Sequence, residues 1–199
     1  MANEKCVELD DLDQNLGCAG GNQGGIIERV IFGYWNDVAV WPDEPVPPAP
    51  GTPLTLEEGG ALEGDVVMKP GTRAFYLEFT EYAGNFAITT DGETDGISAL
   101  YTLNIVKAKL SKKVFGLMNA ALGRRLFFIV TDNNGVNYLM GGKKRGCTLV
   151  SGGDGAVTGT AATDRNQASL QFTYRTGKAL VYEGETDGLL TLVPAPPQE

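Results

Sequence analysis

The residues that could do chemistry in this chain are carboxylates, bases and glycines, because its 199 residues include no histidine. Asp91, Glu93 and Asp95, followed by Gly96, have the spacing with which a calcium-binding loop begins. The position that should supply a bidentate glutamate is Thr102, and we predict no flanking helices. A solvated turn explains these acids better than a calcium site, and catalysis that depends on histidine is excluded.

Three further groups carry weak chemical signals. The glycine runs at 20–25 and 152–155 lack the Gly-Lys-Ser/Thr ending of a phosphate-binding loop. The bases at 143–145 could contact phosphate, but a basic hairpin end or an assembly contact is the favoured interpretation. Asp164 and Arg165 indicate a turn with a local ion pair. We therefore expect a protein that is not an enzyme and holds no cofactor or metal ion; a glycoside hydrolase with paired carboxylates stays open as an alternative.

Composition is typical of one globular domain, with 42% apolar residues and with 27 glycines and 10 prolines that indicate many turns. No apolar run reaches the ~18 residues of a membrane span, and no secretory signal is visible, so we expect synthesis in a cytoplasm without a membrane anchor. Cys6, Cys18 and Cys147 are expected to be reduced thiols, with a Cys6–Cys18 bridge as the alternative.

Charge is divided unevenly along the chain. Residues 1–63 contain twelve acids and two bases, whereas residues 105–146 contain nine bases and one acid. The net charge of −9 disfavours nonspecific binding to nucleic acid. The asymmetry permits head-to-tail attraction between copies, and the alternative is that both regions are solvated faces.

The pattern predicts an N-terminal arm over 1–41 that includes a first strand at 26–35, and its first 23 residues are expected to be poorly structured. Six of the ten prolines fall within 42–53, which predicts a stiff linker or loop. A β-rich body follows over 54–193, and residues 194–199 form a disordered tail. The fold class is mainly β: a two-sheet β-sandwich or partial barrel with one short helix and an extended N-terminal arm.

Alternating and β-branched runs predict the strands of the body. They fall at 54–56, 65–68, 73–80, 86–90, 100–110, 126–130, 136–140, 146–150, 169–174, 179–182 and 189–193. The run 126–130 is the one with the most buried character, and 151–163 is expected to be a long mobile loop. Asn134-Gly135 favours a type I′ hairpin.

The helix is predicted over 112–122, with Ser111 as its N-cap. Phe115, Met118 and Leu122 are expected to form its buried face, and Gly123 a left-handed stop.

One stretch of the chain comprises Asn104–Ser111, the helix with Leu117–Leu122, Phe127–Gly141, Thr158–Thr160 and Asp164–Asn166. The order of these segments resembles the tube-forming subunits of bacteriophage tails. The run Gly24-Gly25-Ile26-Ile27 before an aromatic strand is also similar to such proteins. The proline-dense segment 42–53 departs from that pattern and puts the register of the first strands in doubt.

The resemblance implies a small β-sandwich subunit that forms rings, usually of six copies, which stack into a hollow conduit for DNA. Inner sheets of neighbours would join into one barrel, and arms and loops would bridge rings. The expected partners are further copies, other tail or neck proteins and passing DNA read without sequence recognition, and the expected location is the virion tail. An acidic inner surface would let DNA slide.

The residues that we expect at assembly contacts come from the arm, the basic run and the turn after the glycine-rich loop. They are Gly24, Gly25, Ile26, Trp35, Trp41, Lys143, Lys144, Arg145, Asp164 and Arg165. Two alternatives remain. One is a neck, head–tail completion or ring protein, and the other is a head-decoration or receptor- or glycan-binding module in which Tyr34, Trp35 and Trp41 form an aromatic platform.

Overall fold

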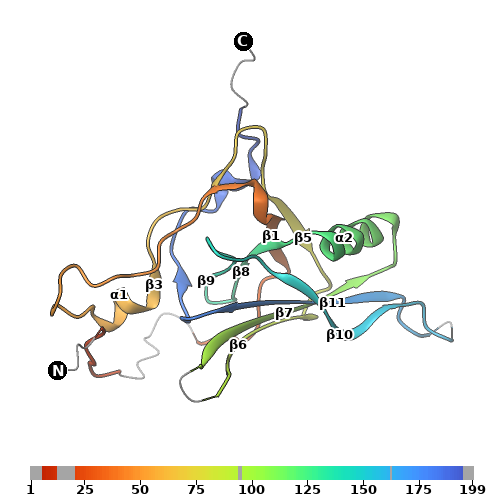
Figure 1. The fold of residues 1–199 in the computed structure, drawn as a ribbon. Helices are drawn as coiled ribbons and strands as arrows, with labels where there is room; N and C mark the ends of the chain where they lie inside the picture. Colours follow the sequence, from red (N-terminus) through yellow and green to blue (C-terminus); the bar gives the residue numbers. More distant parts are fainter. Residues whose placement is uncertain (1–5, 13–20, 94–95, 162, 195–199) are drawn as a thin grey trace, which may run out of the picture.

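The computed structural model describes residues 6–12, 21–93, 96–161 and 163–194 (Figure 1). The strands are β1 (Arg29–Tyr34), β2 (Val38–Val40), β3 (Ala61–Leu62), β4 (Val67–Met68), β5 (Phe75–Glu78), β6 (Gly84–Asp91), β7 (Ser98–Ala108), β8 (Leu126–Thr131), β9 (Asn137–Met140), β10 (Thr148–Val157), β11 (Gln167–Thr176) and β12 (Val181–Tyr182). The α-helices are α1 (Leu56–Gly60) and α2 (Lys112–Gly123), and two 3₁₀ turns are η1 (Trp35–Asp37) and η2 (Asp187–Leu190). The fold is mainly β, as predicted.

Two sheets face each other and enclose the main core. One has the strand order β3-β12-β9-β8-β1-β5, and the other has the order β10-β11-β7-β6. Between them, Phe128 of the larger sheet packs against Phe172 of the smaller one, with the rings tilted by 46° and their centroids 4.5 Å apart. Leu103 and Ile105 of β7 are fully buried in the same cluster. The strict alternation along β7 and β11 therefore follows from sheets with one face in this core.

β8 is buried on both faces, which explains its unbroken apolar sequence. Phe128 and Val130 point into the core between the sheets, whereas Phe127 and Ile129 lie in a second core on the opposite face. That second core is covered by the two-stranded sheet of β2 and β4 and by η2, which contributes the buried Leu189. The predicted burial of 126–130 is confirmed.

The first strand belongs to the body and does not form part of a separate arm. β1 lies between β5 and β8 in the larger sheet, with Ile31 opposite both Tyr76 and Ile129. Val30 is fully buried. Apolar and β-branched residues at 29–34 supply a strand that only partners far along the chain can cover, and β5 and β8 are those partners.

The proline-rich segment 42–53 also packs on the body and forms a loop on its surface. Pro45 is fully buried, and its carbonyl accepts a hydrogen bond from Lys178 at 3.0 Å. Asp43 pairs with Glu63 in an isolated antiparallel bridge. Proline without an amide donor suits such a position, because its ring can be buried without leaving an unpaired N–H.

Helix α2 begins where predicted, with the Ser111 side chain accepting a hydrogen bond from the Val114 amide at 3.4 Å. Its buried face differs by one position from the prediction. Val114 and Ala121 are buried, whereas Phe115 and Leu122 are 44% and 73% exposed. The left-handed stop is also absent, because Gly123 is the last helical residue and the chain turns at the extended Arg124.

The hairpin between β8 and β9 is not type I′, since only Gly135 has a positive φ, of 86°. The Gly135 amide bonds the Asp132 carbonyl at 3.1 Å, and the Asp132 amide bonds the Val136 carbonyl at 2.9 Å. This is a three-residue loop that ends in a glycine bulge. The Asp132 carboxylate favours it by accepting bonds from Asn134 at 2.9 Å and Val136 at 2.8 Å.

Three further segments differ from prediction. Residues 56–60 form α1 in place of a strand at 54–56, because Thr55 and Glu58 make a reciprocal capping box. Residues 151–157 continue β10, paired with β11 through a bulge, where a mobile loop was expected. The strand predicted at 189–193 is absent, because 187–190 form η2 and residues 191–193 belong to no strand. Neither of the two α-helices described has the length and apolar character needed to cross a membrane.

Candidate assembly surfaces

The smaller sheet has a long strand at each of its two edges. β6 pairs with β7, β10 pairs with β11, and the strand order places β6 and β10 at opposite ends. Figure 1 shows this sheet as a separate layer, with the β10–β11 hairpin extending well beyond the larger sheet. Edge strands carry backbone N–H and C=O groups that face outward and can pair with another chain.

Hydrogen-bond alternation identifies which β6 groups face outward. The Val106 amide bonds the Ala83 carbonyl at 3.2 Å, and the register then runs from Gly84 opposite Ile105 to Asp91 opposite Ser98. In an antiparallel pair, bonded and non-bonded positions alternate, so Gly84 and every second residue after it turn their backbone groups away from β7. A groove of about 550 Å³ runs along part of this edge, between β6 and residues 22–26.

The open face of the smaller sheet, which points away from the larger sheet, carries many uncharged polar side chains on β6, β7 and β11. Gln171, Asn104 and Asn85 lie side by side across these three strands, and Thr173 and Thr102 form part of the next row. Arg175 and Asp91, near one end of this face, form a salt bridge with each other. On these three strands the face is therefore not acidic.

Gly24, Gly25 and Ile26 are bound within their own chain. Asn133 donates from its side-chain amide to the Gly24 carbonyl at 2.8 Å, and its backbone amide bonds the Gly25 carbonyl at 3.2 Å. Gly25 has a φ of 98°, and a Cβ there would lie 3.1 Å from the Asn133 amide nitrogen. Ile26 is only 8% exposed. The β8–β9 turn therefore holds this segment, which the sequence patterns did not indicate.

Trp35, Trp41 and the basic run come together, although they lie about a hundred residues apart in the sequence. The Trp35 indole donates to the Gly142 carbonyl at 2.8 Å, and the two tryptophan rings stack with centroids 6.5 Å apart. Gly141 and Gly146 fit against these rings so closely that a Cβ would lie 3.1 Å from Trp41 and 2.8 Å from Trp35. The tryptophans support the basic loop: Trp41 is buried and Trp35 is half-buried, so these two rings do not form an exposed aromatic platform.

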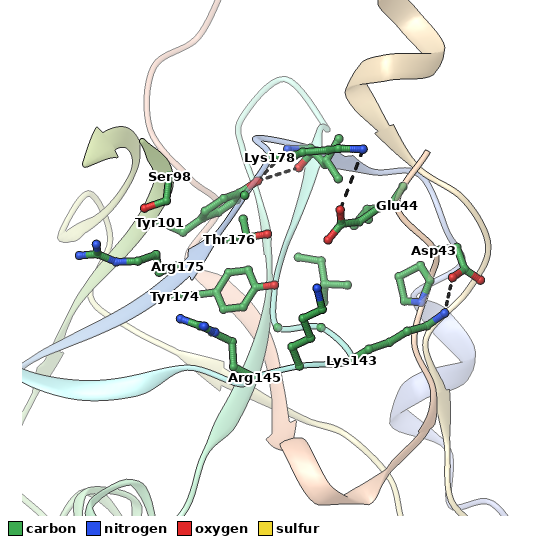
Figure 2. A pocket seen from close by; sticks show the side chains of 18 of the residues that line it. Asp43, Glu44, Ser98, Tyr101, Lys143, Arg145, Tyr174, Arg175, Thr176 and Lys178 are labelled. Atoms are coloured by element: carbon green, nitrogen blue, oxygen red, sulfur yellow. Dashed lines mark hydrogen bonds and ion pairs between the residues drawn. The ribbon is translucent and has the colours of Figure 1, made fainter. Parts of the chain in front are cut away.

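A pocket of about 580 Å³ opens beside this basic loop, at one end of the sandwich (Figure 2). Its apolar lining includes Leu62, Leu139 and Leu180, and its aromatic lining is Tyr101 with Tyr174. These two rings meet edge to face with centroids 5.7 Å apart. Figure 2 shows Tyr101 and Tyr174 between Lys178 on one side and Arg145 on the other.

Five bases and two acids line the pocket, so it is locally cationic in an acidic protein. The bases are Lys143, Lys144, Arg145, Arg175 and Lys178, and the acids are Asp43 and Glu44. Asp43 pairs with Lys143, and Glu44 lies 4.0 Å from Lys178. Within the part of the chain that the structure describes, Lys144 and Arg145 have no salt-bridge partner.

Burial sets the ionisation of the groups beneath this surface. It raises the pKa of Tyr101 and of Tyr174, so both phenols are neutral over the physiological range. Tyr101 accepts a bond from the Leu180 amide at 2.8 Å, which fixes one wall of the pocket. Burial also raises the pKa of the Cys147 thiol, whose sulfur donates to the Met140 carbonyl at 3.0 Å. Cys147 is a core thiol, and Cys6 is exposed and forms no disulfide with a described residue; Cys18, its partner in the alternative prediction, lies outside the described residues.

Asp164 and Arg165 lie in the β10–β11 connection, between Val157 and Gln167. Asp164 forms no salt bridge among the described residues. Instead, its carboxylate accepts bonds from the amides of Ala161 and Thr160, both at 2.7 Å, and these bonds lower its pKa. The expected local ion pair is replaced by a turn that the carboxylate closes.

No group of three or more potential metal ligands gathers among the residues described. Asp95, from the calcium-like spacing, lies outside those residues.

Comparison with known proteins finds no matching family model, no matching curated protein and no matching solved structure.

Proposed function

We propose that this chain is a structural subunit of a bacteriophage virion, of the tail-tube type, that assembles through the edges of its smaller sheet into rings around DNA. One observation carries the proposal: β6 and β10 are long strands at opposite edges of one antiparallel sheet. Pairing β6 of one copy with β10 of the next is a head-to-tail contact, which closes into a ring when the rotation between copies allows it.

The open face of the smaller sheet supports this function in a second way. If the sheet lines the conduit, DNA meets the amides and hydroxyls of Asn85, Asn104, Gln171, Thr102 and Thr173. Such groups offer phosphates no cationic binding site, and the chain's net charge of −9 opposes tight binding. DNA would pass without being held, through a surface whose neutral lining replaces the acidic one first expected.

Electron microscopy of the purified chain tests the proposal, with rings or tubes as the expected result. A backbone variant makes the test specific. Thr90 belongs to the outward-facing set of β6 and is exposed, so Thr90→Pro removes an edge amide without cutting the bonds to β7. Thr90→Pro should abolish rings while Thr90→Ala keeps them. A chain that stays monomeric at high concentration, or rings that tolerate Thr90→Pro, would contradict edge pairing.

A further inference from the structure

The cationic pocket has a surplus of positive charge that its own chain does not neutralise. Lys143 and Lys178 are matched by Asp43 and Glu44, and Arg175 by Asp91, whereas Lys144 and Arg145 face solvent. The lining also includes the leucine side chains and the Tyr101–Tyr174 pair described above. A ligand that suits both features must carry anionic and apolar groups close together.

We propose that this pocket binds an acidic, leucine-containing peptide, namely residues 8–12 of a second copy of the chain. The proposal rests on the self-association proposed above and assigns one of its contacts. Residues 8–12 read Glu-Leu-Asp-Asp-Leu, so three carboxylates and two leucine side chains lie within five residues. Opposite charge at the two surfaces steers association and sets its orientation.

Residues 8–12 are bonded to the body at their first residue and are exposed to solvent beyond it. The Glu8 amide bonds the Leu54 carbonyl at 2.7 Å, and the Leu54 amide bonds the Cys6 carbonyl at 3.1 Å. Beyond this anchor, Leu9 is 87% exposed and Leu12 is 91% exposed. The two leucines are not in their own chain's pocket, so a neighbouring copy is the source that would cover them.

The pocket discriminates against the other anionic partner of a virion protein, which is DNA. Asp43 and Glu44 neutralise Lys143 and Lys178, so the unmatched positive charge is confined to Lys144 and Arg145 and does not form a track for a continuous phosphate backbone, whereas a short peptide can place its two aspartates there. A volume of about 580 Å³ accommodates a few side chains. Leucine side chains of the peptide can pack against the leucines that line the pocket, whereas phosphate groups cannot.

The test measures a blocked peptide of residues 7–12 binding to the full chain by isothermal titration calorimetry. The receptor carries Asp10→Lys and Asp11→Lys, so its own segment does not compete. Adding Lys144→Glu and Arg145→Glu should weaken peptide binding at least about ten-fold, as expected for the loss of two charge contacts. The control is Lys112→Glu with Lys113→Glu, an equal charge change at two exposed bases of α2. Circular dichroism and thermal unfolding check that each variant is folded.

A charge swap gives an independent readout in the whole protein. Reversing Asp10 and Asp11 alone, or Lys144 and Arg145 alone, should weaken self-association in sedimentation velocity, and combining both reversals should restore it. Three results would overturn the assignment: no peptide binding, an equal loss of peptide affinity in the α2 control, or a combined variant whose self-association is not restored. Tighter binding of inorganic phosphate or a short DNA duplex than of the peptide at this pocket would overturn it as well.

These outcomes separate the pocket from the ring proposal. Rings that require the β6 edge, together with a pocket that does not bind the peptide, refute only the pocket assignment. Peptide binding and charge-swap recovery in a chain that forms no rings support the pocket assignment and refute the tube-type function.

Discussion

The bonds between the β8–β9 turn and residues 22–25 allow a quantitative prediction. Asn134 accepts a hydrogen bond from the Gln23 amide at 2.9 Å and donates to the Gln23 carbonyl at 3.0 Å and to Asn22 at 3.2 Å. All three bonds are exposed to solvent. Asn134→Ala removes them together and leaves the backbone bonds of Asn133 in place.

The expected loss is local. A neutral hydrogen bond contributes a net ~0.5–1.5 kcal/mol, and exposed bonds lie at the low end, so three of them sum to about 1–2 kcal/mol. Residues 21–25 are mostly exposed and bury little apolar surface, so they can open without unfolding the sheets. The free energy of local opening should therefore fall, while the global unfolding temperature changes little.

Amide hydrogen exchange measures this difference residue by residue. The Gln23 amide should exchange about 5–30-fold faster in Asn134→Ala, which is the factor that 1–2 kcal/mol provides. The Ile27 amide, bonded to the Thr131 carbonyl at 3.0 Å, serves as the internal reference and should not change. Asn134→Asp keeps the acceptor for the Gln23 amide but loses both donated bonds, so its Gln23 exchange rate should lie between those of the unchanged chain and Asn134→Ala.

Asn119→Ala, at an exposed position of α2, is the matched control. The reasoning fails if Gln23 exchange is unchanged in Asn134→Ala. It also fails if Ile27 accelerates as much as Gln23, because the whole sheet edge would then have loosened.

Four other predictions concern the core and the pocket. Phe172→Ala, at a fully buried ring, should lower the free energy of unfolding by ~3–5 kcal/mol in urea titrations, and a loss below about 1 kcal/mol would contradict its place between the sheets. Gly141→Ala should cost ~1–3 kcal/mol, because Gly141 has a φ of 148° and its Cβ would crowd the aromatic core; an unchanged unfolding midpoint would exclude this. Cys147 should resist a thiol reagent until the chain unfolds, with peptide mapping as the readout, and rapid labelling in the folded chain would show that it is not buried. Burial raises the pKa of Tyr101 and Tyr174 above the ordinary 10.0, so the folded chain holds these two phenol protons more tightly than the unfolded chain does. The free energy of unfolding should therefore be highest below pH 10.0 and should fall as the pH rises through the raised pKa values of the folded chain. Unfolding midpoints that do not change between pH 9 and 11 (roughly the titration range of phenols) would contradict this.

Local patterns predicted the elements whose environment is uniform along their length. Period-two alternation identified β11, because one face of it lies in the core and the other is open. The apolar run of β8 indicated burial on both faces. Ser111 identified the start of α2, since the cap uses only neighbouring residues.

The mistakes arose where distant partners decide the outcome. Residues 151–157 carry mostly small side chains, so no pattern shows that β11 will pair with their backbone. Phe115 is not in the core because α2 is rotated by one position from the predicted orientation, which buries Val114 and Ala121. The helix at 56–60 had a readable signal, the Thr55 and Glu58 capping box, which the strand interpretation overlooked.

Of the candidate surfaces, the basic run was visible in the sequence, but its setting was not. Nothing local to Trp35 indicates that its indole will bond Gly142, and nothing local to Tyr174 or Lys178 indicates that they line the same pocket as the basic loop. These residues meet because strands far apart in the chain end at the same side of the sandwich.

The position of β1 has a consequence for the order of events during synthesis. Ile31 pairs with Ile129, so β1 leaves the ribosome 98 residues before its inner neighbour. At ~5–20 residues per second, that delay is roughly 5–20 s, during which β1 has no β8 to pair with. The edge strand β10 is made later still. If copies pair through β6 and β10 as proposed above, a nascent chain lacks one of the two edges until most of it has been translated, and an unfinished chain could not join an assembly.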